Sequence, residues 1–187
     1  IAHDFNNLLT VILGNAQLGR LKGQHSGTFR AVTLSLLYPV KAGPEGLEQA
    51  LNALCRAASA AVAEGKTLLI LSDRGAKPAH VPIPSLLATA AVHHHLIRNR
   101  ERTRASLIVE SGEPREVHHF CLLVGYGANA INPWLALETV SDLVARGIVT
   151  TGNGDEKALK AYVKAANKGV LKTMSKDHDS GPRHASV

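Results

Sequence analysis

Short, nearly continuous apolar runs alternate with longer helical patterns along most of this 187-residue chain. The runs lie at residues 31–40, 67–71, 105–109 and 128–131. Continuous apolar runs are typical of parallel strands that are buried on both faces, and strict strand–helix alternation predicts a parallel sheet. We therefore expect an α/β protein with a parallel sheet of about four βα units, about half of an eight-stranded barrel, and an extra N-terminal helix.

Proline and glycine mark where the expected helices begin and end. Pro44 and Pro114 lie where the first turn of a helix tolerates a missing N–H, whereas Gly65 and Gly147 follow the last helical residues. The sequence predicts helices over residues 44–64, 82–98, 113–124 and 134–146.

The flanking segments divide the chain further. Residues 1–21 carry apolar side chains at helical spacing, and residues 22–30 contain the glycine and serine of a linker. Residues 31–150 hold the half-barrel, and residues 151–176 predict an amphipathic helix with a lysine face. Residues 177–187 have no apolar pattern, so we expect a disordered tail.

The chain is basic, with a formal net charge of +6 and a sequence pI of about 9.6. Positive charge alone raises nucleic acid as a partner, but no aromatic interleaving and no nucleic-acid motif accompanies it, so we predict no nucleic-acid binding. The charge gathers in the loop 98–104 and on one face of the last helix. The lysines of that face are Lys157, Lys160, Lys164, Lys168, Lys172 and Lys176.

The apolar runs and the two cysteines indicate the cellular compartment of the chain. No apolar run reaches the roughly 20 residues that a membrane-spanning helix needs, so we predict no membrane insertion. Cys55 and Cys121 both fall inside apolar helical patterns, which favours buried thiols in a reducing compartment. We expect a cytoplasmic protein.

Five of the ten histidines lie in two tight clusters, which makes them candidate metal ligands. Consecutive helical residues point about 100° apart, so neither cluster can chelate alone, but one histidine from each helix could converge if the helices are neighbours. Neutral imidazoles with a carboxylate are suited to zinc; packing and helix ends explain the same histidines without a metal. The candidates are His93, His94, His95, His118, His119, Glu113 and Glu116.

Polar residues also follow the apolar runs, at the predicted carboxyl-terminal edge of the sheet. Binding residues of parallel sheets gather at this edge. Asp73 and Arg74 there predict either an ion pair at the edge or an anion pocket, and the other residues expected at the edge are Lys41, Glu110 and Ser111.

The first residues, HDFNNLLTVILGN, resemble the H-box of sensor histidine kinases. The resemblance covers about a tenth of the chain. It implies His3 as the phosphoacceptor and Asp4 as its acidic neighbour, although no ATP-binding domain accompanies them. The alternatives for this segment are a helix that covers exposed core and a helix that mediates dimerisation.

Residues 31–176 resemble a second family. The segments TLSLLYPVKAGPEGLEQAL, TLLILSDRG, PIPSLLATAAVHHHLIR, LIVESGEPREVHHFCLLVGYGANAINPWLALETV and KAYVKAANKGVLKTMSK are similar to the large subunit of glutamate synthase, in the second half of its central domain. The resemblance implies a barrel-like α/β unit that links the glutaminase domain to the FMN site and helps to form the ammonia passage. It implies no redox centre in this unit.

We therefore expect a stand-alone, chimeric central-domain fragment without glutaminase, FMN or iron–sulfur centres. The alternative is a small zinc-dependent hydrolase that acts on small ester or phosphoester substrates. It would use histidines of the 93–95 and 118–119 clusters, brought together across a dimer interface. A half-barrel leaves strand edges and an apolar face open, so we expect a homodimer.

Overall fold

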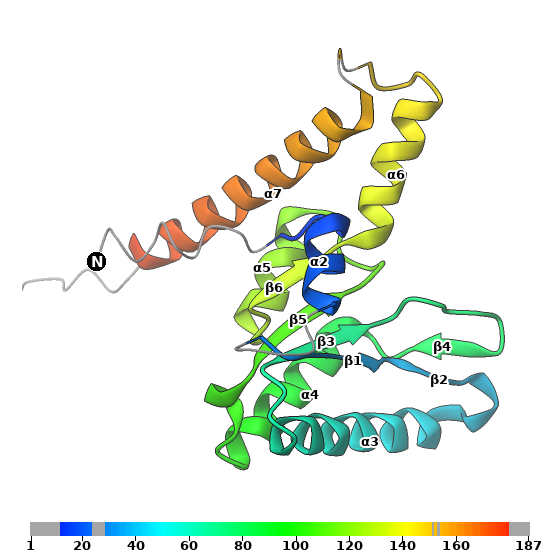
Figure 1. Cartoon of the computed structure of the whole chain (residues 1–187), viewed down its shortest axis with the longest axis vertical. Coiled ribbons are helices and arrows are strands. Elements are labelled where there is room, and N and C mark those ends of the chain that lie inside the picture. The colour runs from blue at the N-terminus through cyan, green and yellow to red at the C-terminus, as the bar shows by residue number, and fades with distance from the viewer. Residues whose placement is uncertain (1–11, 24–28, 151, 153, 180–187) are drawn as a thin grey trace, which may run out of the picture.

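The computed structural model describes residues 12–23, 29–150, 152 and 154–179 (Figure 1). Six strands are present there: β1 Ala31–Ser35, β2 Leu37–Pro39, β3 Leu68–Ser72, β4 His80–Pro82, β5 Ser106–Glu110 and β6 Ala130–Asn132. The α-helices are α2 Asn15–Lys22, α3 Gly43–Ala63, α4 Ser85–Arg98, α5 Val117–Gly125, α6 Trp134–Ala145 and α7 Gly154–Asp179. Two short 3₁₀ helices, η1 Val40–Ala42 and η2 Arg102–Arg104, complete the described elements.

Four strands form one parallel sheet in the order β1-β3-β5-β6. Each neighbouring pair is parallel, and Leu68 of β3 lies between Ala31 of β1 and Ser106 of β5. The strand order follows the chain order, as it does in a barrel. The predicted α/β class with a parallel sheet of four strands is therefore confirmed.

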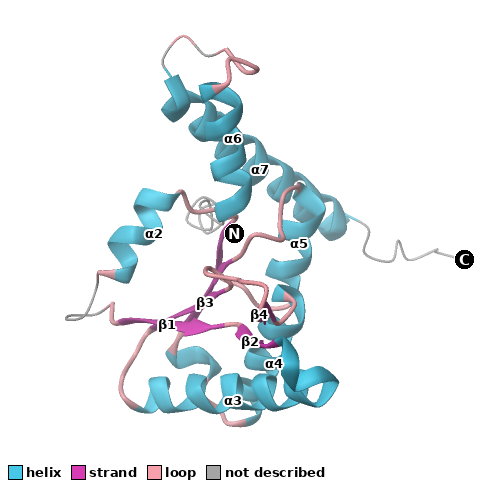
Figure 2. Ribbon diagram, turned by 90° about the vertical axis from the view of Figure 1, so that its right-hand side faces the viewer, coloured by secondary structure: helices cyan, strands magenta, loops and turns pink. Residues whose placement is uncertain are grey.

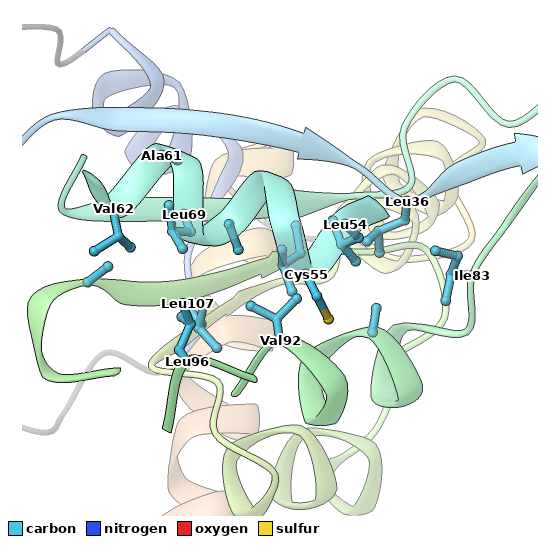
Figure 3. Packing of buried hydrophobic residues seen from close by; sticks show 14 residues of the cluster. Leu36, Leu54, Cys55, Ala61, Val62, Leu69, Ile83, Val92, Leu96 and Leu107 are labelled. Carbon is cyan, nitrogen blue, oxygen red and sulfur yellow. The ribbon is translucent and has the colours of Figure 1, made fainter. Parts of the chain in front are cut away.

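Helices α3, α4 and α5 pack against one face of this sheet. Leu69 and Leu107 of the sheet meet Leu54 of α3 and Val92 and Leu96 of α4, in a cluster that excludes water (Figure 3). Removal of such side chains from water contributes about 1.5–3 kcal/mol each. This face is therefore the larger part of the core.

The N-terminal helix α2 lies on the opposite face of the sheet (Figures 1 and 2). Leu13 and Leu18 pack there on Leu68, Ile70 and Ile108, the strand residues that point away from α3 and α4. In a closed barrel this face would point inward. Helix α2 thus gives an open sheet the second apolar layer that it needs.

Residues 12–14, which the sequence placed in a helix over residues 1–21, are not helical. Ile12 forms a parallel bridge with Ile131, and Leu13 N–H donates to the carbonyl of Ile131, so this segment extends the sheet beyond β6. Gly14 is extended and caps α2, which begins only at Asn15. The free edge of β6 is the reason: it offers unpaired backbone groups that the segment satisfies. Residues 1–11, with His3 and Asp4, lie outside the described part, as do residues 24–28 of the linker and 180–187 of the tail.

Helix α5 begins at Val117, not at Glu113 as the proline pattern predicted. Glu113 instead accepts hydrogen bonds from the N–H and the hydroxyl of Ser85, at the first residue of α4. The first turn of a helix has N–H groups without helical partners and favours a carboxylate there. The contact across two elements therefore outweighs the local start signal at Pro114.

The small antiparallel pair β2–β4 was not predicted. Leu37 lies opposite Pro82 and Pro39 opposite His80, so the pair joins the segments that follow β1 and β3. The pairing partners are more than 40 positions apart, and no turn signal joins them in the sequence.

Helices α6 and α7 extend beyond the sheet (Figure 1). Ala166 and Val170 of α7 are buried in a cluster with Phe120 and Leu123 of α5. The lysine-striped helix is thus docked on the α/β unit by its apolar face. None of the described helices combines the length and the apolar character that a membrane crossing requires.

Candidate functional site

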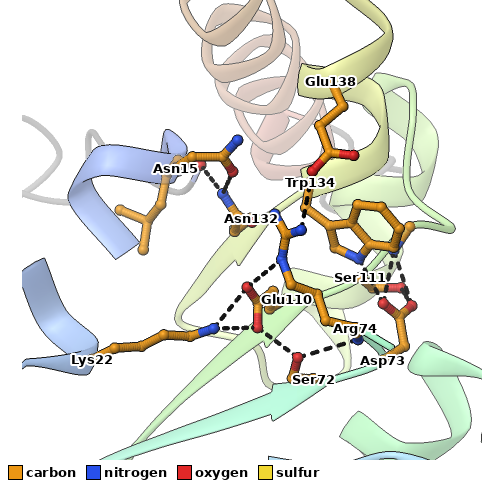
Figure 4. Close-up of polar contacts among 12 residues, drawn as sticks. Asn15, Lys22, Ser72, Asp73, Arg74, Glu110, Ser111, Asn132, Trp134 and Glu138 are labelled. Carbon is orange, nitrogen blue, oxygen red and sulfur yellow. Dashed lines mark hydrogen bonds and ion pairs between the residues drawn. The ribbon is translucent and has the colours of Figure 1, made fainter. Parts of the chain in front are cut away.

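The carboxyl ends of β3, β5 and β6 bring five buried polar side chains to one edge of the sheet (Figure 4). Parallel strands end at the same edge, so residues from distant positions meet there. These residues are Ser72, Asp73, Glu110, Ser111 and Asn132.

Glu110 is the centre of this edge and is 1% exposed. Lys22 at the end of α2 places its Nζ 2.8 and 2.7 Å from the two carboxylate oxygens. Arg74 Nε donates to Oε1 at 2.8 Å, and the Ser72 hydroxyl donates to Oε2 at 2.5 Å. Burial alone would raise the pKa of Glu110. The hydrogen bonds from Lys22, Ser72 and Arg74 and the charge of Lys22 lower the pKa by more than burial raises it, so the pKa lies below its ordinary value. Glu110 is therefore a fixed anion.

Asp73 is held by a separate set of donors. The Ser111 hydroxyl lies 2.6 Å from Oδ2, the Gly112 N–H donates at 2.9 Å to the same oxygen, and the indole N–H of Trp134 donates to Oδ1 at 2.6 Å. Both carboxylate oxygens of Asp73 therefore accept hydrogen bonds from neighbouring segments of the same chain, and these bonds fix the position of its side chain.

Arg74 connects the edge to α6. Its guanidinium donates to Glu110 and, at 3.0 Å, to Glu138, and it stacks over the Trp134 ring at 4.7 Å from the ring centre. The predicted Asp73–Arg74 ion pair is wrong, because Arg74 pairs with Glu110 and Glu138. The guanidinium thus bridges Glu110 and Glu138, and the alternative of an anion pocket stays a prediction. Lys41, the remaining residue expected at this edge, is exposed in η1 and outside the contacts at Glu110 and Asp73.

Asn132 is a member of the edge that sequence reasoning missed. Its amide donates to the carbonyl of Leu13 at 2.8 Å and to Oδ1 of Asn15 at 3.1 Å. Its own Oδ1 is buried without a hydrogen-bond partner in the described structure. A polar residue directly after the apolar run 128–131, on a strand of the same sheet, was the signal that could have found it.

The histidines of α4 make separate contacts. Arg102 Nε donates to Nδ1 of His93 at 2.9 Å, whereas His95 Nε2 lies 2.9 Å from the Ser59 hydroxyl. His94 is exposed and touches His93 edge to face. Desolvation, aided by Arg102 and His94, lowers the pKa of His93 below its ordinary value. His93 and His95 thus serve as partners of neighbouring loops and helices.

The histidines near α5 lie apart from those contacts. His118 is exposed, and His119 accepts the N–H of Arg115 at 3.2 Å with its Nδ1. His119 Nε2 is 3.7 Å from Glu116, on the surface. His119 and Glu113 do share one cavity of about 260 Å³ with Ser85, but Glu113 is bound by Ser85 there.

No three His, Cys, Asp or Glu side chains come together as a metal site within the described residues. The histidines of both helices remain candidates by residue type.

The fold and the carboxyl-terminal edge of its sheet together indicate the class of protein. The parallel sheet carries α3, α4 and α5 on one face and α2 on the other, and the ion pairs at its carboxyl-terminal edge join α2, the sheet and α6. The glutamate synthase central domain family matches residues 4–177 of this sequence. The chain belongs to this family, as the segments in residues 31–176 predicted.

Curated relatives agree with the family match. The large chain of NADPH glutamate synthase from Bacillus subtilis is 42% identical over 169 residues, which cover 90% of this chain and 11% of the relative. The NADH glutamate synthase of Schizosaccharomyces pombe is 40% identical over 148 residues, 79% of this chain and 7% of the relative. Ferredoxin-dependent glutamate synthase 1 of Arabidopsis thaliana is 40% identical over 187 aligned residues, 91% of this chain and 11% of the relative.

This chain therefore spans about a tenth of the length of these relatives. The family match also includes most of the N-terminal segment, from residue 4 onward. The resemblance of that segment to a histidine kinase receives no support from these comparisons.

Proposed function

We propose that this chain is a non-catalytic central-domain unit of a glutamate synthase, without glutaminase, FMN or iron–sulfur centres of its own. The carboxyl-terminal edge of the sheet is the observation that supports this role. Glu110 and Asp73 are both held by donors of the same chain, so they stabilise the edge. The resemblance to the family suggests the role of the unit, which is to connect the glutaminase and FMN domains beside the ammonia passage.

A domain exchange tests this role. Residues 4–177 replace the matching segment of the Bacillus subtilis large chain, and glutamate formation from glutamine and 2-oxoglutarate is measured. We expect activity within about tenfold of the parent, because the unit positions its neighbours and contributes no reacting group. The same assay on the isolated chain should give no glutamate.

Two outcomes would contradict the proposal. One is a chimera that folds and binds flavin but forms no glutamate, since a positioning unit of the family should restore the connection. The other is glutamate formation, or bound flavin, with the isolated chain. The matched control is the same exchange with Glu138→Gln, a half-exposed partner of Arg74 that should leave activity unchanged.

The zinc-dependent hydrolase stays the alternative prediction, and no contact of the described residues favours it. It requires bound zinc and an esterase or phosphoesterase activity that a chelator removes. Metal analysis of the untagged protein, beside His93→Ala and His118→Ala variants, separates the two functions. One zinc ion per chain, with activity lost in both variants, would replace the scaffold proposal.

The homodimer also remains a proposal. Ile12 and Leu13 pair with the β6 edge, whereas β1 has no second neighbouring strand among the described residues. Unpaired strand edges favour association. Sedimentation of the purified chain should show a dimer, and a monomer at all concentrations would contradict it.

A further inference from the structure

A groove of about 710 Å³ lies between α2 on one side and α6 and α7 on the other. Its walls combine two chemistries. Leu137, Leu159 and Val163 provide an apolar strip, and Arg20, Lys160 and Lys164 provide positive charge beside it. This volume lies in the range of natural binding sites, roughly 300–1,000 Å³.

The positive charge of the groove is poorly neutralised from within. Glu156 also lines the groove and pairs with Lys160 at 2.6 Å, but this pair lies on the exposed surface and has little energetic value. Within the described part of the chain, neither Arg20 nor Lys164 forms an ion pair. The first turn of α2, which also lines the groove, carries no acidic residue. Arg20, Lys164 and the first turn of α2 therefore favour an anionic occupant.

The charge continues along α7 beyond the groove. Lys157 precedes Lys160 by three positions, Lys168 and Lys172 follow Lys164 in steps of four, and all three are exposed. From Lys157 to Lys172 the helix rises about 22 Å at 1.5 Å per residue. That length corresponds to about four helical turns and exceeds the length of a small metabolite. The apolar strip beside the lysine row could pack against the apolar face of an amphipathic helix.

We propose that this groove and the lysine row dock an acidic amphipathic helix of another protein domain. Leucine-type side chains of that helix would cover Leu159 and Val163, and its carboxylates would face Arg20 and Lys164. A second copy of this chain is a poor occupant of this groove, because the exposed lysine rows of the two copies would face and repel each other. The homodimer proposed above uses the edge of β1 instead. The inference concerns a different surface from the edge around Glu110 and does not depend on the proposed scaffold role.

The test measures binding of a labelled peptide of about 16 residues to the full chain by fluorescence anisotropy. The probe has leucines on one helical face and glutamates on the others. We expect saturable binding that weakens as salt increases, and about tenfold weaker binding for the double variant Arg20→Glu, Lys164→Glu. Lys41→Glu, an exposed lysine outside the groove, is the matched control and should bind almost as the parent does. Circular dichroism checks that each variant folds.

Three results would overturn the proposal. The first is equal binding of a scrambled peptide with the same composition, which means charge attraction alone. The second is no difference between the double variant and Lys41→Glu. The third is peptide binding that appears only in the double variant Phe5→Ser, Leu8→Ser. That result would mean that the amino-terminal residues of the chain itself occupy the groove and exclude the peptide.

Discussion

At the scale of single residues, Glu110 joins parts of the chain that are far apart in sequence. It ends β5, yet it binds Lys22, 88 positions away, and Arg74, 36 positions away. A buried carboxylate is stable only when such donors compensate its lost hydration. The sequence indicated that Glu110 would lie at a strand end, but not that a lysine from the N-terminal helix would reach it.

Glu110→Gln should reduce the free energy of unfolding by about 3 kcal/mol, because it removes the charge that compensates Lys22 and Arg74. Urea denaturation followed by circular dichroism measures the change. Glu138→Gln is the control: its side chain is 49% exposed, so the same chemical change should cost less than about 1 kcal/mol. Equal losses in the two variants would show that burial of Glu110 is not the source of its effect.

The same residue should make stability depend on pH. The pKa of Glu110 is lower in the folded chain than its ordinary value of about 4.3. Its stabilisation is therefore complete above the ordinary pKa and is lost as pH falls through the folded pKa. The difference in unfolding free energy between the parent and Glu110→Gln should shrink as pH falls from about 7 to about 3. A difference that stays constant over this range would contradict the assignment.

At the scale of elements, glycines and prolines gave several boundaries, and contacts between elements changed others. Gly65 follows the last turn of α3 with a φ of 79°, as its position after the helical pattern predicted. Pro114 did not begin α5, because Glu113 binds the start of α4. Local signals hold where no distant group competes for the same backbone or side chain.

Gly127 connects α5 to β6 and should tolerate no side chain. Its φ is 110°, and a Cβ there would collide with the His93 ring. We expect Gly127→Ala to destabilise the fold by about 2 kcal/mol or more, measured by thermal or urea unfolding.

Gly125→Ala is the matched control for that variant. Gly125 lies at the end of α5 with open space around it, and it lacks a positive φ. Because alanine favours a helix over glycine, this variant should be neutral or more stable, by up to about 1 kcal/mol. A loss at Gly125 as large as that at Gly127 would mean that the connection fails for another reason.

At the scale of the whole molecule, α2 turns an open sheet into a layered fold. The sheet face with Leu68, Ile70 and Ile108 would otherwise be exposed. The sequence indicated an apolar N-terminal helix and left open whether it covers core or mediates dimerisation. In the structure α2 covers this face, and Lys22 at its end binds Glu110.

Leu18→Ala should therefore cost about 2–4 kcal/mol of unfolding free energy and increase binding of a hydrophobic dye. Leu18 is 2% exposed and lies between α2 and the sheet. Leu135→Ala is the control, since that side chain is 42% exposed and its loss should change stability by less than about 0.5 kcal/mol. Native-like stability and no added dye binding in Leu18→Ala would show that α2 is not a necessary cover.

The sequence alone determined the class of fold, the four parallel strands and the family, because alternating apolar runs and family segments are local properties of the chain. Only the tertiary structure decided that Ile12 pairs with β6, that Lys22 and Arg74 share Glu110, and that His93 and His95 serve neighbouring loops. These contacts join residues whose separation in sequence carries no pattern. They depend on where complete elements meet, and only the packing of the apolar faces sets those positions.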